Sequence, residues 1–81
     1  MSKKSISVKI YNETYSLTTE AAIEDAKAVA ELVDSKMQKL ADKTGSHNTE
    51  KVAVWTALDL AAELYDLRIR YAKLLQVAKE D

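Results

Sequence analysis

Cysteine and proline are both absent from this chain of 81 residues, and His47 is its only histidine. Without thiols the chain can form no disulfide, and a single imidazole is too few for a structural zinc site, so we expect no metal and no cofactor. A domain this small rarely builds a core worth more than about 3–5 kcal/mol, and it usually needs a disulfide, a metal or oligomerisation for further stability. Because the first two are missing, we expect a single domain that oligomerises.

An excess of charge of one sign is also missing, since 12 Lys and Arg residues stand against 13 Asp and Glu residues, a net charge of −1. A dedicated nucleic-acid-binding domain would show a basic surface. No run of about 18 apolar residues could span a membrane, and the first residues do not form an apolar leader segment. We therefore expect a cytoplasmic protein that binds neither nucleic acid nor membranes.

No group of residues has the pattern of a catalytic site. A serine or threonine nucleophile needs an adjacent base and an orienting group, and one histidine in a loop does not supply them. The carboxylates of Asp59, Glu63 and Asp66 share one helix face, but Arg70 and Lys73 continue that face, which favours solvated ion pairs over a cation site. We expect no enzymatic activity.

Residues 5–17 alternate apolar and polar side chains, the period-two pattern of half-buried strands. A two-residue loop at Asn12 and Glu13 would pair Val8 with Leu17 and place the apolar side chains on one face. Asn tolerates the positive φ of such a turn, although Glu is less suitable than Gly in its second position. A lone hairpin is marginally stable in water, so we expect this one to pack on a helix.

The apolar residues that follow recur at spacings of three and four, which predicts a helix over about residues 19–43. Thr18 or Thr19 can act as its N-terminal cap, because a side-chain oxygen there accepts a hydrogen bond from the first turn. Gly45, the only glycine, lies just past the end of this helix, where a left-handed C-terminal cap is expected.

A second helix is expected from about residue 49 onward, with Asn48 or Thr49 as its cap and no breaker before the C-terminus. Up to Tyr65 it is apolar on most sides, which predicts burial by several neighbours, including the first helix. Beyond Tyr65 the apolar surface narrows. We therefore predict an α+β, mostly helical fold, with a globular head at residues 1–65 and a coiled-coil tail at residues 66–81.

One apolar row continues along the second helix with alternating spacings of four and three over nearly four heptads. The first helix is too short to cover the end of this row, so we expect a second copy of the chain to cover it. The predicted oligomer interface consists of Ala57, Leu60, Leu64, Leu67, Tyr71 and Leu74. Glu63 could pair with Arg68 of a parallel partner or with Arg70 of an antiparallel one, so the charges leave the orientation open.

Lys36, Lys39 and Lys43 form a basic stripe at the end of the first helix. Cations there complement the helix dipole, and they could also bind a partner. The pattern alone is compatible with both roles.

The segments Val8–Leu17, Ala30–Met37, Asn48–Glu50 and Ala57–Leu64 resemble the ZapA family of bacterial cell-division proteins in sequence, order and spacing. The resemblance implies dimers of globular heads whose tails can pair into tetramers. It also implies binding to filaments of FtsZ, the tubulin-like division protein, which are bundled or aligned at midcell. A different hypothesis is a generic homo-oligomerisation or adaptor module whose partner is not FtsZ.

The resemblance places the filament contacts on the head, at the hairpin turn, the end of the first helix and the start of the second. Glu50 matches the family most directly. The family commonly has Gly where this chain has Asn12, and some members have basic residues around the turn, where this chain has Glu13 and Ser16. The predicted partner-binding residues are Glu50, Lys36, Lys39, Lys43, Asn12 and Glu13.

Overall fold

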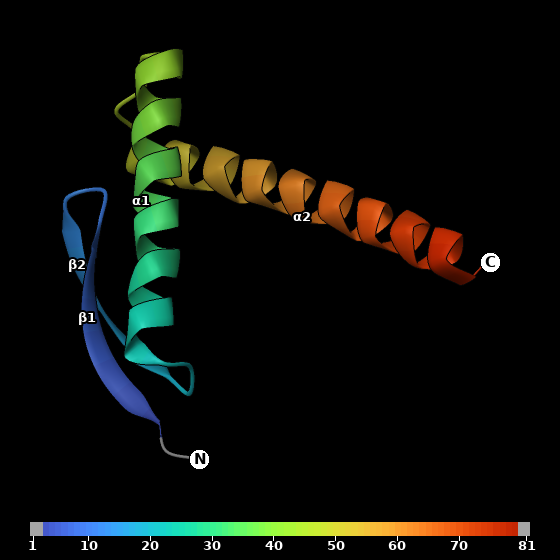
Figure 1. Ribbon diagram of the computed structural model, residues 1–81. Helices are drawn as coiled ribbons and strands as arrows, with labels where there is room; N and C mark the ends of the chain where they lie inside the picture. The colour runs from blue at the N-terminus through green and yellow to red at the C-terminus, as the bar shows by residue number, and fades with distance from the viewer. Residues whose placement is uncertain (1–2, 80–81) are drawn as a thin grey trace.

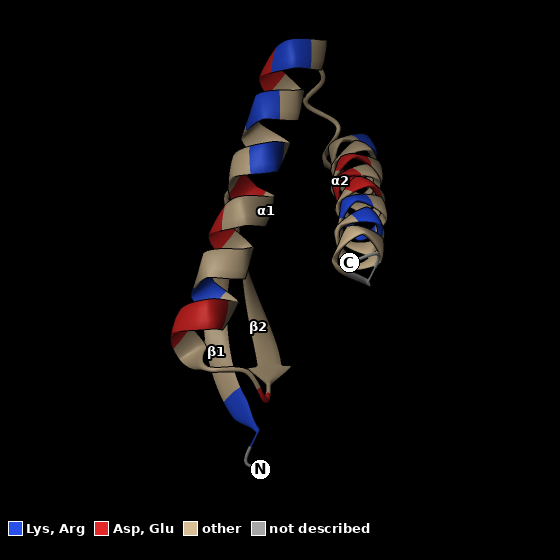
Figure 2. Ribbon diagram, turned by 45° about the vertical axis from the view of Figure 1, so that its right-hand side comes forward, with Lys and Arg blue, Asp and Glu red and all other residues tan. Residues whose placement is uncertain are grey.

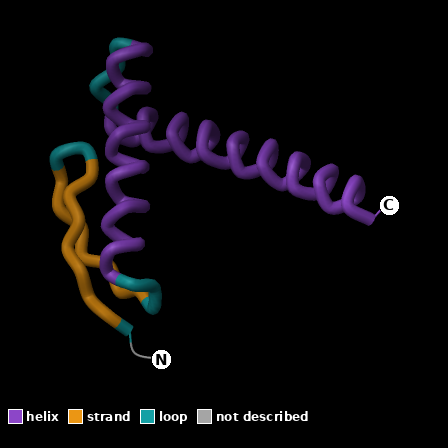
Figure 3. Tube along the Cα trace, viewed as in Figure 1, coloured by secondary structure: helices purple, strands orange, loops and turns teal. Residues whose placement is uncertain are grey.

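A two-stranded antiparallel hairpin followed by two helices makes up the computed structural model, which describes residues 3–79. The elements are β1 (Lys4–Ile10), β2 (Glu13–Thr19), α1 (Ile23–Thr44) and α2 (Thr49–Lys79). The hairpin lies along α1, whereas α2 crosses α1 and runs away from both (Figures 1 and 3). The predicted α+β, mostly helical class is confirmed.

The hairpin turn lies one residue earlier than predicted. Its two central residues are Tyr11 and Asn12, which both have positive φ, 50° and 70°. Val8 consequently pairs with Tyr15, and the predicted pairing of Val8 with Leu17 is wrong by two residues. In the observed register Asn occupies the second left-handed position, which it tolerates better than Glu does. A shift of two residues preserves the alternation, so the apolar side chains still share one face.

A tertiary hydrogen bond holds the turn in this position. The backbone N–H of Tyr11 donates to Oδ1 of Asp34 in α1, with a donor–acceptor distance of 2.7 Å. A carboxylate acceptor makes this bond stronger than a neutral one. The two residues are 23 positions apart in the chain, so the turn sequence alone could not reveal the contact.

The start of α1 was predicted about four residues too early, because β2 extends as far as Thr19. The Thr19 hydroxyl accepts a hydrogen bond from the N–H of Ala21 at 3.0 Å, which closes a local turn and does not cap the helix. The N-cap residue is Ala22, which makes no side-chain cap. The prediction of Thr18 or Thr19 as the cap is therefore wrong.

The connection between the helices follows the prediction. Gly45 has a φ of 71° and its N–H donates to the Ala41 carbonyl at 2.8 Å, as a left-handed C-terminal cap requires. At the start of α2, Oδ1 of Asn48 accepts a hydrogen bond from the N–H of Lys51 at 3.0 Å. Both predicted caps are confirmed, so the end of α1 and the start of α2 are determined locally.

The core consists of two small clusters that meet on α1. The first joins the hairpin to α1 and the second joins α1 to the start of α2, where Val52 is fully buried at 0% exposure. The Thr56 hydroxyl, also buried, donates to the Val52 carbonyl at 2.8 Å, so its burial leaves no unpaired donor. The buried apolar residues are Ile6, Val8 and Ala30 in the first cluster and Met37, Ala41 and Val52 in the second.

Only the beginning of α2 belongs to this core. Because α2 crosses α1 and then diverges from it, every residue from Ala61 to Ala78 is exposed (Figure 1). Two straight helices that cross can touch only near the crossing point. The expectation that α2 packs on α1 as far as Tyr65 is therefore wrong within the single chain.

Candidate protein-interaction surfaces

The apolar row predicted as the oligomer interface lies uncovered on α2. Leu67, Tyr71 and Leu74 are each more than 60% exposed, and Leu64 is 49% exposed. Ala57 is exposed and Leu60 is half-buried. A contiguous apolar surface of this kind usually marks an interaction site. Within residues 3–79, no helix is both long enough and apolar enough to cross a membrane.

The middle part of the row lines a hollow between the two helices. Leu32 of α1 lines this hollow together with Leu60, Leu64 and Leu67 of α2. Its other lining residues are charged, since Glu63, Asp66 and Arg70 also belong to it. The row is therefore not a single ridge on an isolated helix, because α1 contributes an exposed leucine to the same surface. The sequence pattern of α2 could not show the contribution of Leu32.

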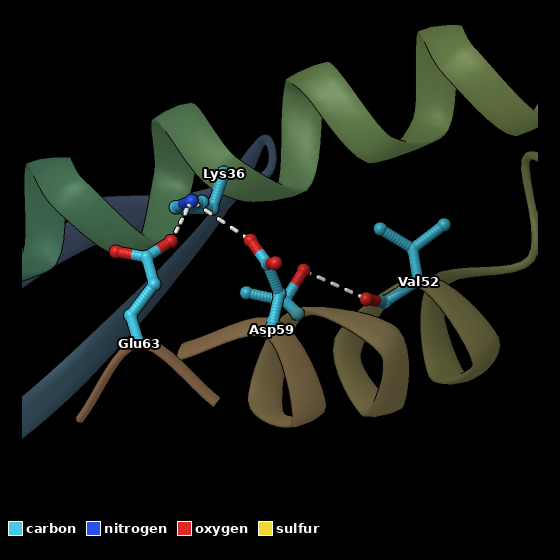
Figure 4. Close-up of polar contacts among 5 residues, drawn as sticks. Lys36, Val52, Asp59 and Glu63 are labelled. Carbon is cyan, nitrogen blue, oxygen red and sulfur yellow. Dashed lines mark hydrogen bonds and ion pairs between the residues drawn. The ribbon is translucent and has the colours of Figure 1, made fainter. Parts of the chain in front are cut away.

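Lys36 of α1 forms an ion pair with two carboxylates of α2. Its Nζ donates a hydrogen bond to Oδ2 of Asp59 at 2.7 Å and another to the Glu63 carboxylate (Figure 4). The bond to Asp59, followed by that to Glu63, raises the pKa of Lys36. The same bond lowers the pKa of Asp59, and the positive charge of Lys43 contributes a smaller effect. Lys36 therefore joins the helices near their crossing.

The predicted ion-paired face of α2 is confirmed. In addition to the pairs with Lys36, Oδ2 of Asp66 lies 3.0 Å from Nε of Arg70, one helical turn further along. The sequence did not indicate Lys36 as a partner of Asp59 and Glu63, because these residues are 23 and 27 positions apart and belong to different helices. All of these charged groups are partly exposed, so each ion pair contributes little to stability. Only the pairs of Lys36 connect the two helices.

The structure brings the hairpin turn close to the C-terminal end of α1 and the loop that follows it. Asn12 and Glu13 line a shallow hollow together with residues that sequence reasoning had not selected as sites. These additional residues are Tyr11, Gln38, Ala41, Asp42, His47 and Thr49. The sequence indicated two parts of this hollow, the turn at Asn12 and Glu13 and the loop around His47, but not that they lie side by side.

The remaining predicted partner-binding residues do not line this hollow. Lys39 and Lys43 are exposed on the C-terminal part of α1, where basic residues recur along the helix (Figure 2). Glu50 is exposed on the first turn of α2 but lines a separate hollow with Val54 and Trp55. Lys36 is directed toward α2. The hairpin turn and the two lysines thus lie beside or on the C-terminal half of α1, with Glu50 on an adjoining surface.

Comparisons with known proteins agree with this architecture. The family model described as "Cell division protein ZapA" matches residues 6–80. The chain is 30% identical over 79 residues to the Cell division protein ZapA of Geobacillus kaustophilus (strain HTA426), which covers 98% of this chain and 87% of the relative. It is 33% identical over 72 residues to the protein of the same name from Bacillus thuringiensis (strain Al Hakam), covering 89% and 81%.

A solved structure, described as a ZapA mutant dimer from Geobacillus stearothermophilus, has the same arrangement of elements. It superposes with a TM-score of 0.78 at 30% sequence identity, covering 98% of this chain and 92% of that one. The match extends over the hairpin and both helices, and the family model spans nearly the whole chain. The chain therefore belongs to the ZapA family of cell-division proteins.

Proposed function

We propose that this chain is a non-catalytic accessory protein of cell division that self-associates through α2 and binds FtsZ filaments through its head. The observation that carries the proposal is the apolar row on α2, which no described residue of the chain covers beyond Leu60. Membership of the ZapA family indicates that the protein acts in cell division, and the solved relative described as a dimer supports self-association.

Self-association is energetically favourable for a row of this composition. Burial of a leucine contributes about 1.5–3 kcal/mol, so Leu60, Leu64, Leu67 and Leu74 from two chains offer up to about 12–24 kcal/mol. Bringing two chains together costs about 4–15 kcal/mol. The balance favours a dimer, with pairing of two dimers into a tetramer as a further step. The chain itself is the first partner.

The head would supply the contact with FtsZ. The contact residues would be Asn12 and Glu13 of the hairpin turn, the exposed lysines Lys39 and Lys43, and Glu50 on the adjoining surface at the start of α2. Lys36 would act indirectly, because its ammonium group is paired with carboxylates of α2. We assign residues 1–65 to the head and residues 66–81 to the tail. Residues 1, 2, 80 and 81 lie outside the described part of the chain.

The mechanism is multivalency. Two or more heads joined by a rigid helical spacer can engage neighbouring filaments, and the second contact then forms at a high effective concentration. Overall avidity can exceed the affinity of one contact by about 10²- to 10⁴-fold without any new contact. A weak head contact is thus sufficient to align or bundle filaments, and the protein would act in the cytoplasm at the division site.

Co-pelleting with GTP-assembled FtsZ from the same organism tests the proposal, with unassembled FtsZ as a control. We expect the chain to sediment with bundled filaments. The variant Leu67→Glu should lose bundling, because it loses the second head, and should sediment only weakly. A folded, dimeric protein that fails to co-pellet would contradict FtsZ binding and would leave an oligomerisation module with a different partner.

A further inference from the structure

The hairpin turn consists of residues that do not favour its conformation by themselves. Tyr11 and Asn12 both have positive φ, 50° and 70°. Asn tolerates this left-handed conformation, but a bulky residue such as Tyr is strained there. A hairpin turn with two left-handed residues prefers Asn followed by Gly. The sequence Tyr-Asn therefore needs support from elsewhere in the fold to keep this conformation.

Contacts with the helices supply this support. The backbone N–H of Tyr11 donates to Oδ1 of Asp34 at 2.7 Å, and Asp34 is half-buried on α1. The Tyr11 side chain packs against the second core cluster, which contains Val52. Strained backbone conformations persist where the surrounding structure holds them, and they are frequent at sites that bind a ligand. The turn is thus held by its backbone and by a side chain together.

Two hairpin registers are compatible with the strand pattern. A register with Asn12 and Glu13 in the turn would differ from the observed one by two residues and would keep the apolar side chains on the same face. In that register Tyr11 would leave the turn and join the end of β1. The hydrogen bond to Asp34 holds Tyr11 in the turn and so favours the observed register.

The face of α1 that carries Asp34 also forms one wall of the hollow beside the turn. Gln38 and Asp42 follow Asp34 by four and eight residues, so the three side chains lie in one row along the helix. Gln38 and Asp42 line the hollow together with Asn12 and Glu13 of the turn. The residue that holds the turn is therefore the first member of the row that the turn faces.

We propose that Asp34 is a positioning residue of the partner-binding surface on the head. It holds Tyr11 in the left-handed turn, and the turn then presents Asn12 and Glu13 beside α1 in one fixed arrangement. A surface that is ordered before binding loses less conformational entropy when the partner docks, so it binds more tightly. This inference rests on the proposed binding of FtsZ through the head and adds a residue that shapes the contact without touching the filament.

Three single variants test this role. Asp34→Ala removes the hydrogen-bond acceptor, whereas Asp34→Asn keeps an oxygen acceptor and loses the charge. Glu31→Ala is the matched control, because it removes the same charge from an exposed position about one turn earlier on α1. Hydrogen exchange of the Tyr11 amide, followed by nuclear magnetic resonance, reports the turn, and co-pelleting with GTP-assembled FtsZ reports binding. Circular dichroism and sedimentation establish that each variant is folded and has the natural mass.

In Asp34→Ala the Tyr11 amide should exchange at least roughly tenfold faster, because a hydrogen bond to a charged acceptor is lost. The apparent Kd for the filaments should rise roughly tenfold, since only a fraction of the molecules then has the turn in its binding conformation. Asp34→Asn should lie between Asp34→Ala and the natural chain in both measurements. Glu31→Ala should match the natural chain in both.

Faster exchange with unchanged binding would overturn this inference and leave the binding of FtsZ by the head intact. Weaker binding with unchanged exchange would also overturn it, because Asp34 would then contact the filament directly. If Asp34→Ala does not fold, the comparison of Asp34→Asn with Glu31→Ala decides in the same way. A natural chain that is folded and dimeric but does not co-pellet would overturn the proposed function and this inference with it.

Discussion

Val52 and Leu67 lie on the same helix, fifteen residues apart, and have opposite surroundings. Val52 is fully buried between α1 and α2, whereas Leu67 is 63% exposed. Hydrophobic character does not distinguish them, since both side chains are aliphatic. The difference arises because α2 touches α1 only where the two helices cross. The first turns of α2 are thus part of a core, and the rest of the helix is a surface that is available to a partner.

The largest effect is expected from a charge at Val52, the buried residue of the two compared above. Val52→Asp should destabilise the head by about 3–5 kcal/mol, because an uncompensated carboxylate would be buried. This is a large part of the stability of a small domain. Urea denaturation followed by circular dichroism measures it. Val77→Asp is the matched control on the exposed part of α2 and should change the free energy of unfolding little; equal effects would show that the two regions do not differ.

The second largest effect is expected from a charge at Leu67, the exposed residue of the two. Leu67→Glu should dissociate the oligomer, because each chain loses the burial of a leucine worth about 1.5–3 kcal/mol and gains a charge. Two such losses per dimer correspond to a dissociation constant roughly 10²- to 10⁴-fold higher. Sedimentation velocity measures the mass, and Gln76→Glu is a control on the exposed part of α2 outside the row. An unchanged oligomer in Leu67→Glu would remove the apolar row from the interface.

A smaller effect is expected at the end of the head. Lys39→Glu combined with Lys43→Glu should weaken filament binding by up to roughly tenfold, since exposed charges contribute modestly and are screened by salt. The oligomeric mass should not change. Co-pelleting with FtsZ gives the binding, and Lys27→Glu, an exposed lysine near the other end of α1, is the control. If the control variant binds as weakly as the double variant, the effect belongs to net charge and not to this end of the head.

The smallest effect concerns the ion pair at the crossing itself. The pKa of Asp59 is lowered by Lys36, so its contribution to stability is present above its ordinary pKa of 3.8 and is lost as the pH falls through the lowered value. The pKa of Lys36 is raised, so its contribution is present below 10.5 and is lost as the pH rises through the raised value. The variant Lys36→Met should therefore differ from the natural chain most between these limits.

Thermal unfolding of both proteins across this pH range measures the difference. It should shrink in acid, in strong base, and at about 1 M salt, where the screening length is only about 3 Å. Arg70→Met is a control, because Arg70 pairs with Asp66 within α2 and does not connect the helices. A difference that is constant from acid to base would mean that Lys36 acts through packing alone.

Much of the fold could be predicted because its signals are local. The alternation of residues 5–17 indicated a hairpin, and Gly45 and Asn48 indicated where α1 ends and α2 begins; the structure has all three features. The register and the start of α1 were predicted wrongly. In each case a competing interaction decided the outcome: Asp34 holds the turn at Tyr11, and β2 continues through the residues expected to cap α1.

The candidate sites were predictable to a different degree. The row from Ala57 to Leu74 was evident from its heptad spacing, and its exposure supports the role proposed for it. The participation of Leu32 was not evident, since it comes from the other helix. The contact of Asp34 with the hairpin turn was equally hidden, because the alternating pattern of the strands predicts which side their residues face but not which residues occupy the turn.

The sequence by itself determined the kind and order of the elements, the helix ends at the loop and the apolar row, because these depend on residues within one or two turns of each other. Only the tertiary structure decided where α2 crosses α1 and which carboxylates Lys36 meets. Those features depend on contacts between residues more than twenty positions apart, such as the pair of Lys36 with Asp59. Side-chain packing at the crossing determines them, and periodicity along one helix carries no information about that packing.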